Sequence, residues 1–149
     1  MKIYFDPSLL VALYLPERRT RKLREWLAEV RTPIGLNVWQ ELEFKNAARQ
    51  KVRRGEADEG DLARTFRIFD DDCLHGRIVR RTVSWEALFA EGERLSRKFA
   101  TSKDCRSFDL IHVALRHFPP DPSTAWPRPW GGVSGCPPLR WRPRESSHP

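Results

Sequence analysis

Three acidic residues have the neighbours expected of a metal site. Asp6 follows the apolar residues 3–5, Glu43 lies within residues 41–47, and Asp109 lies within residues 106–114. The apolar neighbours of each acid are of the kind that form a core. A carboxylate is rarely buried among such residues unless it pairs with a cation or binds a metal. The pattern therefore predicts a divalent metal site made of Asp6, Glu43 and Asp109.

The chemistry of such a site follows from its ligands. Carboxylates that converge raise one another's pKa until a cation neutralises them. Oxygen ligands of this kind suit Mg²⁺ or Mn²⁺. Two such cations, roughly 3.5–4 Å apart, can activate a water molecule and stabilise the leaving oxygen of a phosphodiester. Phosphodiester hydrolysis is thus the reaction that these residues predict.

The first half of the chain predicts the elements that would position two of the acids. Residues 3–5 are β-prone, and the apolar residues 9–15 predict a helix that is buried on most sides and ended by Pro16. An amphipathic helix is expected over residues 23–30 and an extended segment over residues 33–36. Asn37 can cap a helix that runs to about Arg53. Four residues of that helix share one stripe by their spacing: Trp39, Glu43, Asn46 and Gln50.

The second half continues the alternation of helices and strands. A helix is expected over residues 58–74, a strand over residues 78–83, and two further helices after Ser84 and from Ser107. Alternating strands and helices favour an α/β fold with a small parallel sheet covered on both faces. Ligands in such folds gather at the carboxyl ends of strands, where Asp6 would lie. The helix after Ser84 is expected to bury Trp85, Leu88, Phe89, Leu95 and Phe99.

Composition sets the domain count and the compartment. Residues 1–116 are expected to form one domain, whereas residues 117–149 are rich in Pro, Arg and Trp without periodicity and are expected to be disordered. The net charge of +7 fits a surface that binds phosphates, although it is also common in Arg-rich proteins. The three cysteines have no paired spacing, and no segment is apolar for long enough to cross a bilayer. A cytoplasmic protein without a membrane span is expected.

Three segments of the chain match the motifs of a known family. They are Ile3-Tyr4-Phe5-Asp6-Pro7-Ser8, Glu43-Phe44-Lys45-Asn46-Ala47 and Arg106-Ser107-Phe108-Asp109-Leu110-Ile111-His112-Val113-Ala114. With these segments the chain resembles the PIN-domain ribonucleases, in particular the VapC-like toxins of type II toxin–antitoxin systems, over residues 1–116. This resemblance implies a three-layer α/β/α fold and a Mg²⁺- or Mn²⁺-dependent endoribonuclease whose metal ligands match Asp6, Glu43 and Asp109. It also implies a homodimer that a cognate antitoxin neutralises, with Ser8 and Asn46 near the substrate.

The chain departs from this family at two places. Pro7 stands where the family has Thr or Ser, a mild change because Pro suits the first turn of a helix. After Leu115 the family continues to a last strand and a fourth acid, whereas this chain offers only Asp121 and Glu145 in proline-rich surroundings. We therefore expect the last strand to be missing. A frameshift near codon 116 or a degenerate gene copy is one hypothesis; translation of the other two frames beyond that codon tests it.

Each candidate has an alternative interpretation. Asp6 can be a helix N-cap, and Asp109 can complement the dipole of its helix. Glu43 can be a surface residue, with Glu41 as a competitor for the metal. His112 is more often a core residue than a catalytic one and is left out of the site.

Two other functions are alternatives to the ribonuclease. One is a catalytically impaired PIN-fold module that only binds antitoxin or RNA. The other, a phosphatase of the haloacid-dehalogenase kind, is disfavoured because it needs a second Asp where Ser8 stands.

Overall fold

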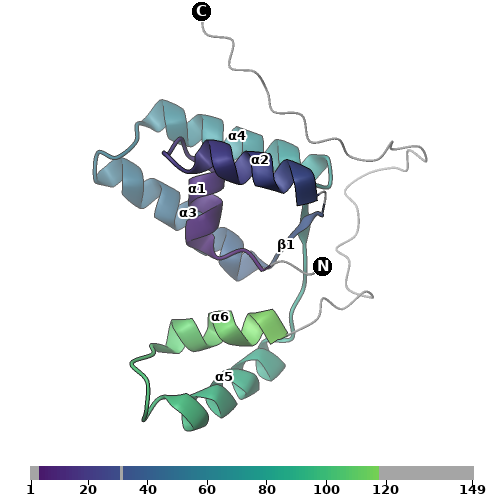
Figure 1. Cartoon of the computed structure of the whole chain (residues 1–149), viewed down its shortest axis with the longest axis vertical. Coiled ribbons are helices and arrows are strands. Elements are labelled where there is room, and N and C mark those ends of the chain that lie inside the picture. Colours follow the sequence, from purple (N-terminus) through teal and green to yellow (C-terminus); the bar gives the residue numbers. More distant parts are fainter. Residues whose placement is uncertain (1–3, 31, 118–149) are drawn as a thin grey trace, which may run out of the picture. The chain divides into compact units, whose positions relative to one another are not determined.

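The computed structural model describes residues 4–30 and 32–117, with no side-chain description for Val30 and His117. The described chain forms two compact units, residues 4–79 and residues 80–117 (Figure 1). Apart from His117, both units lie within the range predicted as a single domain. The predicted disordered tail, residues 117–149, and the missing last strand lie outside the described residues, apart from His117 at the end of a helix.

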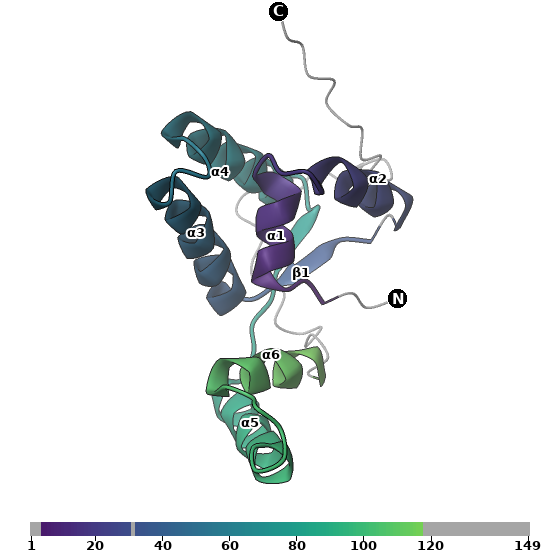
Figure 2. The ribbon, with the colours of Figure 1, turned by 60° about the vertical axis from the view of Figure 1, so that its left-hand side comes forward.

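The first unit contains four helices and a small parallel sheet. The helices are α1 (Pro7–Tyr14), α2 (Thr20–Val30), α3 (Val38–Arg53) and α4 (Glu59–Leu74). Strand β1 (Ile34–Leu36) pairs with β2 (Ile78–Arg80), whose last residue belongs to the second unit. The crossover from β1 to β2 runs through α3 and α4, as a parallel pair requires. Figure 2 shows α1 inside this unit, with α2 on one side and α3 and α4 on the other.

Local hydrogen bonds explain where the helices begin. The side chain of Asn37 accepts a hydrogen bond from the backbone N–H of Gln40, and the side chain of Gln40 accepts one from the backbone N–H of Asn37, which makes a capping box at the start of α3. Asp58 caps α4 through the backbone N–H of Asp61. After α3 and α4, Gly55 and Gly76 adopt positive φ values of 73° and 70°, which glycine tolerates best. The predicted extents of both helices are confirmed to within one residue.

The core of the first unit is centred on α1. The residues from Leu10 to Leu15 are all buried, so the prediction of a helix that is apolar on most sides is confirmed. The rings of Tyr14, Phe44 and Phe69 pack together, with centroid distances of 4.9–5.6 Å. These contacts join α1, α3 and α4. Burial of a large apolar side chain contributes roughly 1.5–3 kcal/mol, so this cluster holds the three helices in place.

A buried polar network ties α1 to α4 and to the start of β2. The hydroxyl of Tyr14 donates a hydrogen bond to Oδ2 of Asp72 at 2.6 Å, and the guanidinium of Arg77 pairs with Asp72. Asp72 is only 6% exposed, and Arg77 also reaches Asp71 at 3.0 Å. Burial and the neighbouring Asp72 carboxylate both raise the pKa of Tyr14. The carboxylate is therefore paired in the core, as a buried charge must be.

The predicted first strand is not formed by the residues that the structure describes. Tyr4 and Phe5 belong to no strand, and Ile3 lies outside the described residues. The carbonyl oxygen of Phe5 instead accepts a hydrogen bond from the side chain of Gln40. A side chain thus supplies the partner that a neighbouring strand would give, while Phe5 itself is buried.

The second unit is a helical hairpin of α5 (Trp85–Phe99) and α6 (Ser107–His117). Ser84 caps α5, as predicted, and the two helices approach so closely that a Cβ on Gly92 would lie 3.0 Å from Cδ1 of Ile111. The prediction that Trp85 and Phe89 are buried was wrong, because they are 40% and 59% exposed. The face of α5 that packs within this unit carries Leu88, Gly92 and Leu95 instead.

No helix in the described part of the chain has the length and apolar character needed to cross a bilayer.

Candidate metal site

Asp6 occupies the N-cap of α1. Its Oδ1 atom accepts a hydrogen bond from the backbone N–H of Ser8 at 2.8 Å and another from the Ser8 hydroxyl. Both bonds use the same oxygen, and within the described residues Oδ2 accepts none. The carboxylate is exposed. Asp6 can therefore cap the helix with one oxygen and offer the other to a cation, so the two interpretations of this residue are compatible.

Glu43 lies on α3 and is half-buried. Its Oε2 oxygen has an accessible area below 1 Å². An ionised carboxylate is costly to desolvate, so a buried one pairs with a cation, accepts hydrogen bonds or becomes protonated. Its competitor Glu41 is engaged elsewhere, because Nζ of Lys45 lies 2.7 Å from Oε1 of Glu41.

The hydroxyl of Tyr4 lies within electrostatic reach of both acids. Burial raises the pKa of Tyr4 most, and the charges of Asp6 and Glu43 raise it further, whereas a hydrogen bond with Gln40 acts in the opposite direction. Two carboxylates on different elements, at positions 6 and 43, therefore act on one phenol. Asp6 and Glu43 thus both lie in the neighbourhood of Tyr4.

Gln40 joins the segments that carry the two acids. Its Nε2 donates a hydrogen bond to the Phe5 carbonyl at 2.9 Å, next to Asp6 in sequence. Gln40 also lies one helical turn before Glu43 and is 3% exposed. Sequence reasoning missed Tyr4 and Gln40 as site residues. The capping-box spacing of Asn37 and Gln40 is a recognisable signal for the start of α3, but nothing local indicates the contact with Phe5.

Asp109 belongs to the second unit. It lies in the first turn of α6, where its Oδ2 accepts a hydrogen bond from the backbone N–H of Arg106 at 2.9 Å. It is exposed. Its negative charge at this position also complements the helix dipole, as the alternative interpretation holds. His112, one turn later, is half-buried.

The predicted substrate residues Ser8 and Asn46 are both exposed. Ser8 donates to Asp6 and therefore lies beside the first acid. Asn46 follows Glu43 by three residues on α3, which places the two on neighbouring turns of one face. Both positions are compatible with contact to a substrate that reaches the acids.

The donor set fits a hard cation. Asp6 and Glu43 supply carboxylate oxygens, the ligands that Mg²⁺ and Mn²⁺ prefer. Within either unit, the described residues contain no group of three or more His, Cys, Asp or Glu side chains that could hold a metal. In the first unit, Asp6 and Glu43 are thus the pair of candidate metal ligands.

Comparison of the chain with family models, with curated proteins and with solved structures found no match.

Proposed function

We propose that the protein is a divalent-metal-dependent endoribonuclease of the PIN-domain type, a VapC-like toxin neutralised by a cognate antitoxin and acting as a homodimer. The observation that carries the proposal is the hydrogen bond from Gln40 to Phe5, which holds the segment that ends in Asp6 against the helix that carries Glu43. Carboxylates that converge in this way suit a cation that offsets their charge. The α/β character of the chain is compatible with a three-layer PIN fold.

The proposed roles follow from the contacts of each residue. Asp6 and Glu43 would hold Mg²⁺ or Mn²⁺, and we assign the third carboxylate to Asp109 from the family resemblance. The bound metal would activate water and stabilise the leaving oxygen of the RNA phosphodiester. Ser8 holds Asp6 in place by donating a hydrogen bond from its hydroxyl. Gln40 holds Phe5, the residue before Asp6, against α3. Asn46 would contact the substrate.

Cleavage assays with a matched pair of variants test this function. Asp6 and Asp58 are both helix N-caps, and Asn caps helices about as well as Asp. We expect Asp6→Asn to abolish cleavage of structured RNAs in Mn²⁺ or Mg²⁺, whereas Asp58→Asn retains it. Wild-type cleavage should stop when a chelator is added. Equal cleavage by wild type and Asp6→Asn, with both variants folded, would refute the assignment.

The second candidate is a PIN-fold module that binds antitoxin or RNA without turnover. Its support is that neither unit contains three metal-ligating side chains together within the described residues. The same assay separates the two functions. A wild-type chain that binds RNA but never cleaves it, with either metal, is the result that favours the module.

A further inference from the structure

A large open pocket in the first unit has a strongly basic lining. It has a volume of about 1160 Å³ and lies among α1, the connection to α2, α2 itself and α3. Its lining includes the apolar residues Leu9, Leu23 and Ala47. Five cationic side chains line it against one carboxylate, Glu17. The five are Arg18, Arg19, Lys22, Lys51 and Arg54.

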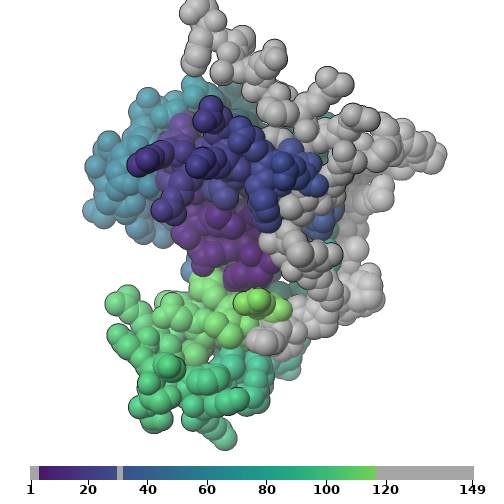
Figure 3. All heavy atoms as spheres, viewed as in Figure 1, coloured from purple at the N-terminus to yellow at the C-terminus, as the bar shows by residue number. Residues whose placement is uncertain are grey.

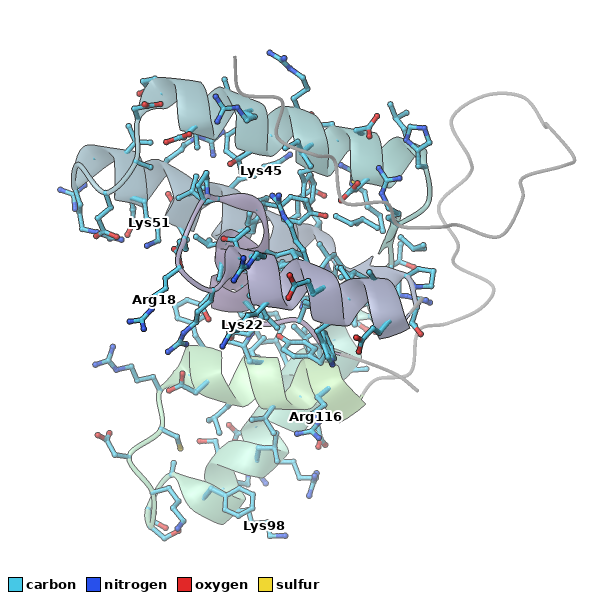
Figure 4. The ribbon with its side chains drawn as sticks, turned by 45° about the horizontal axis from the view of Figure 1, so that its top comes forward. Arg18, Lys22, Lys45, Lys51, Lys98 and Arg116 are labelled. Atoms are coloured by element: carbon cyan, nitrogen blue, oxygen red, sulfur yellow. The ribbon has the colours of Figure 1, made fainter. Side chains whose placement is uncertain are left out.

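Internal ion pairs account for only two of these cations. Nζ of Lys51 lies 2.8 Å from Glu17 and 2.8 Å from Glu56, and these hydrogen bonds raise the pKa of Lys51. Arg54 also pairs with Glu56. The lone carboxylate of the lining is thereby already neutralised. Figure 4 labels Arg18 and Lys22 beside Lys51 in this region.

Three cations of the lining make no ion pair within residues 4–30 and 32–117. They are exposed and lie at the start of α2: Arg18, Arg19 and Lys22. Figure 3 shows the atoms of α2 at the surface beside those of α1. The first turn of α2 contains no acidic residue. Cations at a helix N-terminus oppose the helix dipole, so these residues destabilise α2 unless an anion binds there.

The pocket also reaches the proposed metal site. Ser8 is part of its lining, and the Ser8 hydroxyl donates a hydrogen bond to Asp6. A polyanion bound in the pocket would therefore extend as far as Asp6, the first proposed metal ligand. None of the described residues that line the pocket is aromatic, so it has no surface on which bases could stack.

We infer that this pocket binds the phosphates of single-stranded RNA next to the cleavage site, through Arg18, Arg19 and Lys22. The inference rests on the proposed function and adds to it how the substrate is held. Contact with phosphates alone positions a strand without reading its sequence. The pocket therefore binds RNA of any sequence, and its contribution falls steeply as salt rises.

Two triple variants of equal charge test the inference. The pocket variant carries Arg18→Gln, Arg19→Gln and Lys22→Gln. The control carries Arg21→Gln, Arg53→Gln and Arg67→Gln, which remove three exposed arginines of the same unit that do not line the pocket. Fluorescence anisotropy measures binding of oligouridylate and oligoadenylate to the whole chain in chelator, so that no cleavage occurs. Oligoglutamate serves as a competitor.

We expect wild type and control to bind both RNAs alike, with the same dependence on salt. The slope of log Kd against log salt should fall by about 2 in the pocket variant, since each single-strand phosphate contact contributes about 0.7. Its thermal midpoint should be no lower than that of wild type, because unfavourable charges at the start of α2 are removed.

Several outcomes would overturn the inference. They are an unchanged slope in the pocket variant, an equal loss in the control, or no binding of RNA by wild type. Displacement of RNA by oligoglutamate at a lower concentration than by unlabelled RNA would point to an acidic protein partner instead. Cleavage assays with metal separate the two proposals. RNA binding without cleavage defeats only the ribonuclease, whereas cleavage that the pocket variant retains in full defeats only the pocket.

Discussion

Gln40 donates a hydrogen bond from Nε2 to the carbonyl oxygen of Phe5 at 2.9 Å, across 35 residues of sequence. Both residues are buried, and they are 3% and 2% exposed. The bond fixes the segment that ends in Asp6 against the helix that carries Glu43. The relative position of the two acids therefore depends on a neutral side chain that binds no metal itself.

Replacement of Gln40 by Leu should destabilise the first unit by about 1–3 kcal/mol, because the buried Phe5 carbonyl loses its donor. The capping box of α3 would be lost as well. Urea unfolding followed by circular dichroism measures the effect. Gln50→Leu is the control on the same helix, since Gln50 is exposed and its replacement should change stability by less than about 0.5 kcal/mol. Equal stabilities of the two variants would contradict this role of Gln40.

The tyrosines predict how the protein responds to alkali. The chain has two tyrosines, Tyr4 and Tyr14, and the pKa of each is raised above 10, chiefly by burial. A raised pKa means that the folded state favours the neutral phenol. The associated stability is complete below pH 10 and is lost as the pH rises beyond that value. Tyrosinate absorbance should therefore appear only well above pH 10. Ionisation of either tyrosine near pH 10 in the folded chain would disagree.

Tyr4 can also report the position of the two acids. In a Tyr14→Phe background, Tyr4 is the single tyrosine, and its absorbance gives its pKa alone. Asp6→Asn and Glu43→Gln should each lower that pKa, because each removes a negative charge that opposes ionisation. Asp58→Asn should leave it unchanged. A pKa that responds to neither substitution would show that the acids do not share this neighbour.

Glu56 predicts a contribution to stability in acid. Hydrogen bonds from Arg54 and then Lys51 lower the pKa of Glu56 from 4.5 to about 2. A carboxyl group whose pKa is lower in the folded state stabilises the fold at pH values above its pKa in the unfolded chain. This contribution is therefore lost as the pH falls from about 4.5 to about 2. Urea midpoints across that range, compared between wild type and Glu56→Gln, measure it. The difference in urea midpoint between wild type and Glu56→Gln should shrink in acid. A difference that stays constant would exclude this origin.

The fold was more predictable from sequence than the site was. Asn37 and Ser84 cap helices through neighbouring backbone groups, so their chemistry is visible in a few residues. The contact of Gln40 with Phe5 and the sharing of Tyr4 by Asp6 and Glu43 depend on tertiary packing, which no local pattern encodes. The exposure of Trp85 and Phe89 arises in the same way, because periodicity marks an apolar face without showing what it packs against.

The most direct test of the central claim is thermal unfolding with and without Mn²⁺. A cation that binds only the folded chain raises its midpoint, and the rise grows with metal concentration. Wild type and Asp58→Asn should show this rise, whereas Asp6→Asn and Glu43→Gln should lose most of it. An equal rise in all four proteins would contradict a metal site built on Asp6 and Glu43.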